Sequence, residues 1–262
     1  MQQEVRRLVF ITGASSGIGQ ALALRYYQAG YALALVARRT AQMQAWVAAC
    51  AISIERCRIY SVDVSVVDEI VAAGHACIAQ QGVPDVVIAS AGISIGVDTA
   101  CRADLDVMAK IFALNNVGLA ATFHPFIASM VQRGFGTLVG VASVNGIRGF
   151  PGHGAYCASK AGVISYCESL RGELAPKGVR VLTICPGYVD TPLTHKNRNS
   201  MPFLLPATGF AERAFKAIAA NRSYSVIPWQ MAVVAKALRL MPNWLFDKVA
   251  SRRTRKPRSA DL

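Results

Sequence analysis

The stretch Thr12-Gly13-Ala14-Ser15-Ser16-Gly17-Ile18-Gly19 decides the fold of this chain. It follows an apolar, strand-like run over 8–12 and opens a helical pattern over 20–28. Glycines let such a turn tighten and let backbone amides approach a phosphate, and the following helix adds its positive dipole end. The spacing is G-x-x-x-G-x-G, not the dinucleotide fingerprint G-x-G-x-x-G, so the turn alone leaves open whether it binds a ligand.

Apolar strand-like runs alternate with helical patterns along the rest of the chain. The predicted strands cover 8–12, 32–37, 59–62, 86–89, 137–142, 179–185 and 225–227, and the longest helical patterns cover 103–131 and 156–174. Strands that are apolar on both faces and separated by helices are typical of a parallel sheet. The predicted fold class is α/β, a doubly wound Rossmann-type parallel sheet with helices on both faces. We expect a single domain over 1–220, and a C-terminal extension over 221–262 that packs on it.

The composition excludes several classes of protein. Of the 262 residues 53% are hydrophobic and 16% are charged, which is enough apolar surface for a core and excludes a disordered chain. Seven scattered cysteines without a C-x-x-C pair indicate free thiols, and the four histidines are isolated, so we expect no metal centre. The polar, basic N-terminus and the lack of a long uninterrupted apolar run predict a cytoplasmic protein without a signal peptide.

The net charge of +13 is concentrated near the C-terminus, because more than half of the excess lies within 222–262. An apolar stripe in the helical pattern over 229–241 is formed by Met231, Val234, Leu238 and Met241. This pattern predicts peripheral contact of 229–258 with the inner face of a membrane, or else a core helix or subunit interface followed by a solvated basic tail. We expect no nucleic-acid partner, since no aromatic-and-basic recognition motif accompanies the charge.

The end of the second strand indicates which nicotinamide cofactor would fit. An enzyme that uses NAD usually carries an acidic residue there, about 20 residues after the glycines, for the ribose hydroxyls. Here Ala37 holds that place and is followed by Arg38 and Arg39. A guanidinium binds a 2′-phosphate that an acid would repel, so the sequence predicts NADP(H) rather than NAD(H), unless the two arginines simply flank the strand.

A second motif carries acid–base chemistry. Tyr156 and Lys160 lie four residues apart and share one face of a predicted helix. A nearby ammonium favours the charged form of tyrosine, which would make the phenol a workable general acid or base. Ser143, thirteen residues before Tyr156, stands at the end of a predicted strand, where its hydroxyl could hydrogen-bond a substrate carbonyl.

Together these motifs resemble the short-chain dehydrogenase/reductase family over roughly residues 7–195. TGASSGIG is similar to the family's cofactor turn, and Ser143, Tyr156 and Lys160 match its catalytic residues in type and separation. PGYVDT, over 186–191, matches the family's P-G-x-V-x-T segment, and Asp63-Val64 matches the acidic residue near the adenine. One departure is Ser90-Ala91-Gly92, where the family usually has N-A-G, which puts the local geometry of that loop in doubt.

The resemblance implies a catalytic tetrad. Its fourth member is Asn115, three residues before Gly118, with Asn116 as the neighbouring candidate. Tyr156 would donate a proton to the carbonyl oxygen, Ser143 would hold that oxygen, Lys160 would bind the nicotinamide ribose, and Asn115 would position water. The residues expected to contact the cofactor are Gly13, Ser15, Ser16, Gly17, Ile18, Gly19, Arg38, Arg39, Asp63, Val64, Ser90, Ala91, Gly92, Tyr156, Lys160, Pro186, Gly187, Val189 and Thr191.

Substrate choice is less well defined by the sequence. By family position the pocket would be lined by Asn145, Phe150, His153, Tyr188 and Leu193, with the loop over 192–206 closing on it. The apolar stretch 201–205 suggests a lipophilic substrate or simply packs on the core. We therefore expect an NADP(H)-dependent reductase of a small carbonyl compound that forms a homodimer or tetramer. The alternatives are an oxidative dehydrogenase of a hydroxysteroid or other secondary alcohol, and a catalytically silent nucleotide-binding scaffold.

Overall fold

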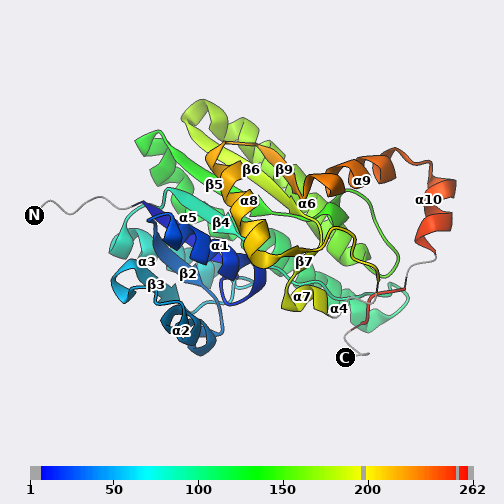
Figure 1. The fold of residues 1–262 in the computed structure, drawn as a ribbon, viewed down its shortest axis with the longest axis horizontal. Helices are drawn as coiled ribbons and strands as arrows, with labels where there is room; N and C mark the ends of the chain where they lie inside the picture. Colours follow the sequence, from blue (N-terminus) through cyan, green and yellow to red (C-terminus); the bar gives the residue numbers. More distant parts are fainter. Residues whose placement is uncertain (1–6, 196–198, 252–253, 259–262) are drawn as a thin grey trace, which may run out of the picture.

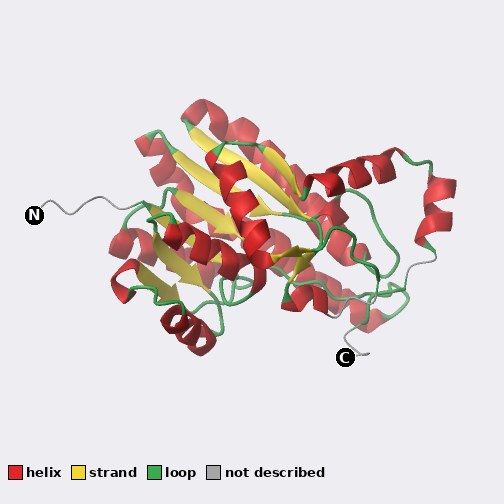
Figure 2. Ribbon diagram, viewed as in Figure 1, coloured by secondary structure: helices red, strands yellow, loops and turns green. Residues whose placement is uncertain are grey.

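The computed structural model describes residues 7–195, 199–251 and 254–258. Its centre is a seven-stranded sheet in the order β3-β2-β1-β4-β5-β6-β9, with every pair parallel (Figures 1 and 2). The strands are β1 (Leu8–Thr12), β2 (Ala32–Val36), β3 (Cys57–Tyr60), β4 (Val86–Ala89), β5 (Gly136–Val141), β6 (Val179–Pro186) and β9 (Tyr224–Ile227). This order, with helices on both faces, confirms the predicted doubly wound fold.

Two hydrophobic cores lie on the two faces of the sheet. One face is covered by α1 (Gly17–Gln28), α2 (Thr40–Ala49) and α8 (Ala207–Ala219), and the other by α3 (Val67–Gln81), α5 (Gly118–Arg133) and α6 (Gly154–Leu174). Strand β1 shows how successive side chains serve opposite faces, since Phe10 packs under α5 while Ile11 packs under α1. The Phe10 and Phe126 rings lie 4.9 Å apart between centroids, within the core under α3, α5 and α6.

The predicted helix over 103–131 is a continuous helical run with an irregular turn in its middle. Helix α4 (Arg102–Phe112) passes through a π-helical turn (Ala113–Val117) into α5. By length and composition this run could cross a membrane, but 50% of its most apolar window is buried inside the molecule. That burial is the pattern of a core helix, and π-turns of this kind often accompany functional sites.

Two predicted segments differ in detail. Strand β3 begins two residues before the predicted 59–62, because it lies at the sheet edge, where an exposed Arg58 interrupts the apolar pattern. The segment 192–206, predicted as a loop, contains the short helix α7 (Pro192–His195) and ends in β8 (Leu205–Pro206). Strand β8 pairs with β7 (Val189–Asp190) in a small second sheet that a search for apolar runs does not detect.

The C-terminal part of the chain leaves the body and then returns to it. Strand β9 lies beyond residue 220 and still belongs to the main sheet, whereas α9 (Trp229–Leu240) and α10 (Asn243–Ala250) project at the side (Figure 1). Arg148 ties the end of α9 to the loop after β5, since its guanidinium donates to the carbonyl of Leu238 and, at 2.6 Å, to that of Met241.

The predicted apolar stripe on α9 does not face outward as a whole. Met231 is 5% exposed and packs against Gly187, and the other three stripe residues are half-buried. The exposed apolar side chains of this part are instead Trp229, Val233, Leu240, Trp244 and Val249. Of the basic residues predicted in the tail, Arg252 and Arg253 lie outside the described residues.

We expect Phe126→Ala to lower the free energy of unfolding by about 3–5 kcal/mol, because it opens a cavity between α5 and the sheet. Phe135→Ala is the matched control, since that ring is 54% exposed and its loss should cost less than about 1 kcal/mol. Urea unfolding of both variants, followed by circular dichroism, measures the difference. Equal destabilisation by the two substitutions would contradict the assignment of Phe126 to the core.

Candidate active site

A cavity of about 490 Å³ lies at the edge of the sheet where the parallel strands end. It runs from the turn after β1 to a short stretch of the C-terminal tail, 254–257. Every residue predicted to contact a cofactor lines it, and so do Ser143 and the five residues predicted for the substrate pocket. Asn115 is the one predicted site residue that does not line this cavity.

The backbone around the glycine turn after β1 packs so closely that side chains at Gly13 and Gly19 would not fit. Gly13 has φ +69°, and a Cβ atom there would lie 2.8 Å from the Cα of Ala91. A Cβ on Gly19 would overlap the carbonyl oxygen of Gly13. Within the described residues no side chain caps the N-terminus of α1 at Ser16, which leaves its first amides to face the cavity. An uncapped helix start beside bare glycine backbone is the donor set that a pyrophosphate needs.

Two arginines border this turn at the end of β2. The Nη2 atom of Arg39 lies 3.2 Å from the Oγ of Ser15 and 3.4 Å from the Oγ of Ser16. The Nη1 atom of Arg38 lies 3.3 Å from the Oδ2 of Asp63, in a largely exposed ion pair. The guanidinium of Arg39 therefore lies closer to the turn. Arg38 is paired with Asp63, the residue that matches the acidic residue near the adenine in the family.

The predicted acid–base residues meet at the other end of the cavity. Ser143 stands just beyond β5, and α6 presents Tyr156 and Lys160 from one face. All three are less than a tenth exposed. The Lys160 Nζ donates to the carbonyl of Val141 at 2.8 Å and lies 5.9 Å from the centre of the Tyr156 ring.

Burial dominates the protonation of this pair. It raises the pKa of Tyr156 to about 12, against the opposing effect of a hydrogen bond with Ser143. It also lowers the pKa of Lys160 to about 8. From the sequence we expect the ammonium to depress the pKa of the tyrosine, but in this structure burial is the largest effect and raises that pKa. Tyr156 is consequently a protonated phenol at neutral pH and can donate a proton.

Asn115 lies behind the cavity wall, in the π-helical turn. Its amide accepts from the backbone N–H of Ile93 at 2.9 Å and donates to the Ile93 carbonyl at 3.0 Å and to the Ser159 hydroxyl at 2.9 Å. The side chain thus joins the loop after β4 to helix α6. Asn116 donates to the Ser159 carbonyl. The direct catalytic role predicted for Asn115 stays a prediction, while its contacts are those of a positioning residue.

The loop with the unusual Ser90 is held through its backbone. The amides of Ser90 and Ala91 donate to the Oγ1 of Thr12, at 3.2 and 3.3 Å. Since backbone groups make these bonds, the position of the loop does not depend on an asparagine side chain at residue 90. Gly92 then faces Asn115 and Lys160, because a Cβ there would lie 3.2 Å from the Asn115 Oδ1.

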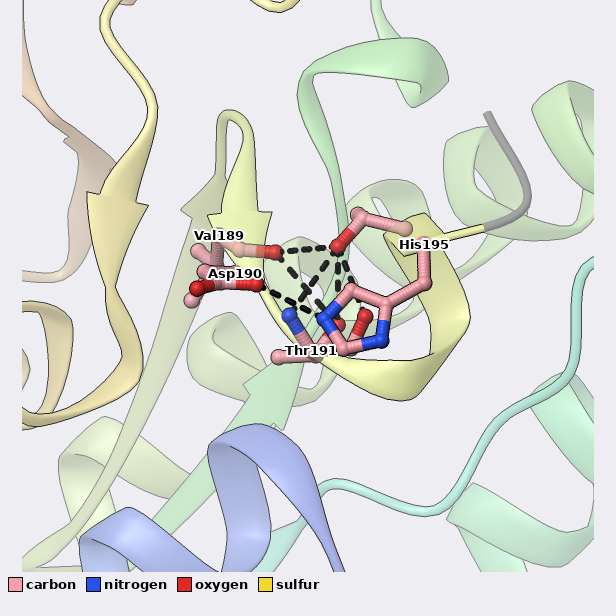
Figure 3. A network of polar contacts seen from close by, with 5 residues as sticks. Val189, Asp190, Thr191 and His195 are labelled. Atoms are coloured by element: carbon pink, nitrogen blue, oxygen red, sulfur yellow. Dashed lines mark hydrogen bonds and ion pairs between the residues drawn. The ribbon is translucent and has the colours of Figure 1, made fainter. Parts of the chain in front are cut away.

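A compact polar network holds the wall opposite the glycine turn (Figure 3). The Thr194 hydroxyl bonds the Val189 carbonyl at 2.6 Å, and the amide of Thr191 donates to the Thr194 hydroxyl at 3.0 Å. Asp190 pairs with the ring of His195 at 2.8 Å on the exposed side. The network presents the Thr191 methyl group to Gly17, where a Cβ would lie only 3.0 Å away.

The substrate end differs from the sequence-based expectation in two respects. None of 201–205 lines the cavity, and Phe203 and Leu204 are 49% and 43% exposed, so this stretch neither borders the pocket nor packs fully on the core. The tail residues Thr254, Arg255, Lys256 and Pro257 do line it, together with Ser94 and Asn199. Sequence reasoning missed them because a basic tail carries no local pattern that indicates where it folds.

Comparison with known proteins agrees with this geometry. The family model described as short chain dehydrogenase matches residues 7–202. An oxidoreductase of Myxococcus xanthus is 38% identical over 94% of this chain and 97% of its own. A short-chain dehydrogenase of Sphingobium yanoikuyae in complex with NADPH has a TM-score of 0.77 at 24% identity, over 95% and 96% of the two chains. One from Burkholderia phymatum in complex with NAD has a TM-score of 0.80 at 24% identity, over 97% and 98%.

We expect Gly19→Ala to destabilise the protein by about 1–3 kcal/mol, because the added methyl group pushes the glycine turn apart. It should also weaken nucleotide binding at least tenfold. Gly172→Ala is the matched control, since Gly172 is an exposed position of α6 with open space around it. That exchange should stabilise by about 0.5–1 kcal/mol. Thermal unfolding measures the stability of the two variants, and nicotinamide fluorescence titrations measure their nucleotide affinity. Normal nucleotide binding by Gly19→Ala would contradict the proposal that the glycine turn binds the pyrophosphate.

Proposed function

The chain belongs to the short-chain dehydrogenase/reductase family, and from this premise we propose that it is an NADP(H)-dependent reductase that converts a carbonyl into an alcohol. The observation that carries the proposal is the pairing of two features in one cavity. At one end Arg38 and Arg39 border the glycine turn, and at the other Ser143, Tyr156 and Lys160 converge.

The choice of NADP(H) is argued from the end of β2. Ala37 stands where an acid would bind the ribose hydroxyls of NAD, and Arg39 reaches the two serine hydroxyls of the turn. A 2′-phosphate placed there would meet two guanidinium groups and one acid, Asp63, that Arg38 already neutralises. Solved structures of similar fold hold either NADPH or NAD, so the arginines of this chain are the better guide.

We expect Arg39→Ala and Arg38→Ala each to weaken NADPH binding at least tenfold while changing NADH binding less than twofold, because only NADPH carries the 2′-phosphate. Arg39→Ala should have the larger effect, since Arg38 already has an acidic partner. Arg102→Ala, at an exposed i,i+4 pair, is the control. Nicotinamide fluorescence titrations give both constants. Equal losses for the two nucleotides would contradict the assignment, and binding of neither nucleotide by the wild type would undo the proposed function.

The chain's own residues supply orientation and the proton. A bound nicotinamide supplies the hydride. Tyr156 donates its phenolic proton to the substrate oxygen, and the raised pKa keeps that proton in place at neutral pH. Ser143 shares a hydrogen bond with Tyr156 and holds the same oxygen as charge develops on it. Lys160 is fixed by its bond to the Val141 carbonyl, with its ammonium 5.9 Å from the centre of the Tyr156 ring, and would bind the nicotinamide ribose.

We expect Tyr156→Phe to lower kcat by about 10²–10⁴-fold, because the general acid is removed while the ring remains. NADPH affinity should change less than twofold. Tyr166→Phe, at a position on the same helix that is 37% exposed, is the control. The assay follows NADPH depletion with the best ketone or aldehyde from a screen. Full activity of Tyr156→Phe would exclude the proposed acid.

Several expectations stay predictions. Oxidative turnover of a hydroxysteroid or other secondary alcohol uses the same groups in reverse, and a silent scaffold would bind nucleotide without turnover. A homodimer or tetramer and a cytoplasmic location are proposed on family grounds and on sequence. Membrane contact is supported by the exposed Trp229, Leu240 and Trp244, but not by the stripe that contains Met231. A lipophilic substrate has lost its support from 201–205, since that stretch lies outside the cavity.

A further inference from the structure

The basic C-terminal tail folds back over the substrate end of the cavity, and its residues 254–258 form a strap there. Arg258 makes two bonds to the buried carboxylate of Asp104, at 2.6 and 3.2 Å, which lower the pKa of that acid. The Nη1 atom of Arg255 lies 3.3 Å from the Oδ2 atom of Asp98. The strap is thus attached by ion pairs to the loop before α4 and to the start of α4.

Backbone contacts hold the same strap in register. The amide of Gly96 donates to the carbonyl of Pro257 at 3.0 Å. Asn199 and Thr254 exchange two bonds, at 3.0 and 3.1 Å. Gly96 lies so close to the Lys256 carbonyl that no side chain would fit. These contacts come from two separate parts of the chain, around Gly96 and at Asn199, so the strap has one defined position over the cavity.

The strap points Lys256 into the cavity. Its Nζ donates to the hydroxyl of Ser94 at 2.6 Å and lies 5.9 Å from the centre of the Tyr156 ring. Lys160 lies at the same distance from that ring. The buried ammonium of Lys160 and the half-buried ammonium of Lys256 therefore both lie near the ring of the proton donor.

Within 7–195, 199–251 and 254–258, no carboxylate balances this charge at the substrate end. Among the described residues that line the cavity, the one acid is Asp63, which belongs to the opposite end and pairs with Arg38. Arg255 and Arg258 use Asp98 and Asp104, whereas Lys256 has a neutral hydroxyl as its hydrogen-bond partner. An ammonium has three donors, and a half-buried cation without a counter-charge is costly, as the pKa of Lys256 near 8 reflects.

We propose that Lys256 is a specificity-determining residue that binds an anionic group of the substrate, so that the preferred substrate is a carbonyl compound that also carries a carboxylate. This inference rests on the proposed function and deepens it. A substrate carboxylate would supply the missing counter-charge and would accept the remaining donors of Lys256. The same contact would fix the substrate carbonyl relative to Tyr156 and Ser143.

The test compares acids with their uncharged esters. The wild type, Lys256→Gln and the control Lys248→Gln, an exposed lysine on α10, are assayed with NADPH on 4-oxopentanoate, 5-oxohexanoate, 7-oxooctanoate and their methyl esters. We expect Lys256→Gln to raise the KM for the preferred acid at least tenfold, with the ester changed less than twofold, because a charged hydrogen bond is lost only with the acid. Lys248→Gln should alter neither.

Other outcomes overturn the inference. The inference fails if the activity of Lys256→Gln falls equally with the acid and with the ester, or if the pH profile of the variant's activity shifts with both substrates. Lys256 would then act on the pocket or on Tyr156 rather than on a substrate anion. Asp104→Asn, which loosens the strap but keeps Lys256, should also raise the KM for the acid more than that for the ester.

A binding measurement separates this inference from the proposed function. Calorimetric titration of the NADPH-mixed full chain with octanoate and octanamide needs no turnover. We expect octanoate, but not octanamide, to bind at least tenfold more weakly to Lys256→Gln than to the wild type. Absence of turnover of every carbonyl would sink the proposed function alone, whereas octanoate that binds both proteins equally, or neither, would sink the role of Lys256.

Discussion

Parallel pairing carries the carboxyl ends of β1, β2, β4, β5 and β6 to one edge of the sheet, and the groups that line the cavity gather along this edge. Residues far apart in the chain, such as Gly13, Ser90 and Ser143, become neighbours only through this register. Close helix packing then completes the site. Gly140 lets α6 approach β5, since a Cβ there would overlap Cys167, and α6 in turn delivers Tyr156 and Lys160.

Burial at this edge sets the chemistry as much as position does. Both members of the acid–base pair lie in a poorly solvated environment, which favours the neutral form of each. A phenol that keeps its proton is suited to give it to a carbonyl oxygen that gains electrons. The neighbouring ammonium is held by a backbone carbonyl and not by an acid, so its field remains available to whatever charge forms on the substrate.

The parts of the fold and the site that the sequence predicts are those encoded by local patterns. The glycine turn, the buried strands and the Tyr156–Lys160 spacing depend on residues within a few positions of one another, and the structure places them as expected. The bounds of strand β3 are harder to predict, because an edge strand is only half apolar. The orientation of α9 is also harder to predict, because an apolar stripe on a helix does not indicate which part of the molecule packs against it. Asn115 shows a further limit, since a matched residue type does not reveal which way the side chain points.

The C-terminal tail illustrates why net charge alone is a poor guide to function. Counted as a sum, its cations suggest a membrane or a solvated end, but Asp98 and Asp104 neutralise two of them within the same molecule. Those pairs hold a strap whose remaining described cation, Lys256, is directed toward Tyr156 and away from bulk water. The ion pairs and backbone bonds of the strap offset the cost of partly desolvating that ammonium. Any anion that enters the cavity recovers part of the same cost, which is how an anchored tail can select a substrate.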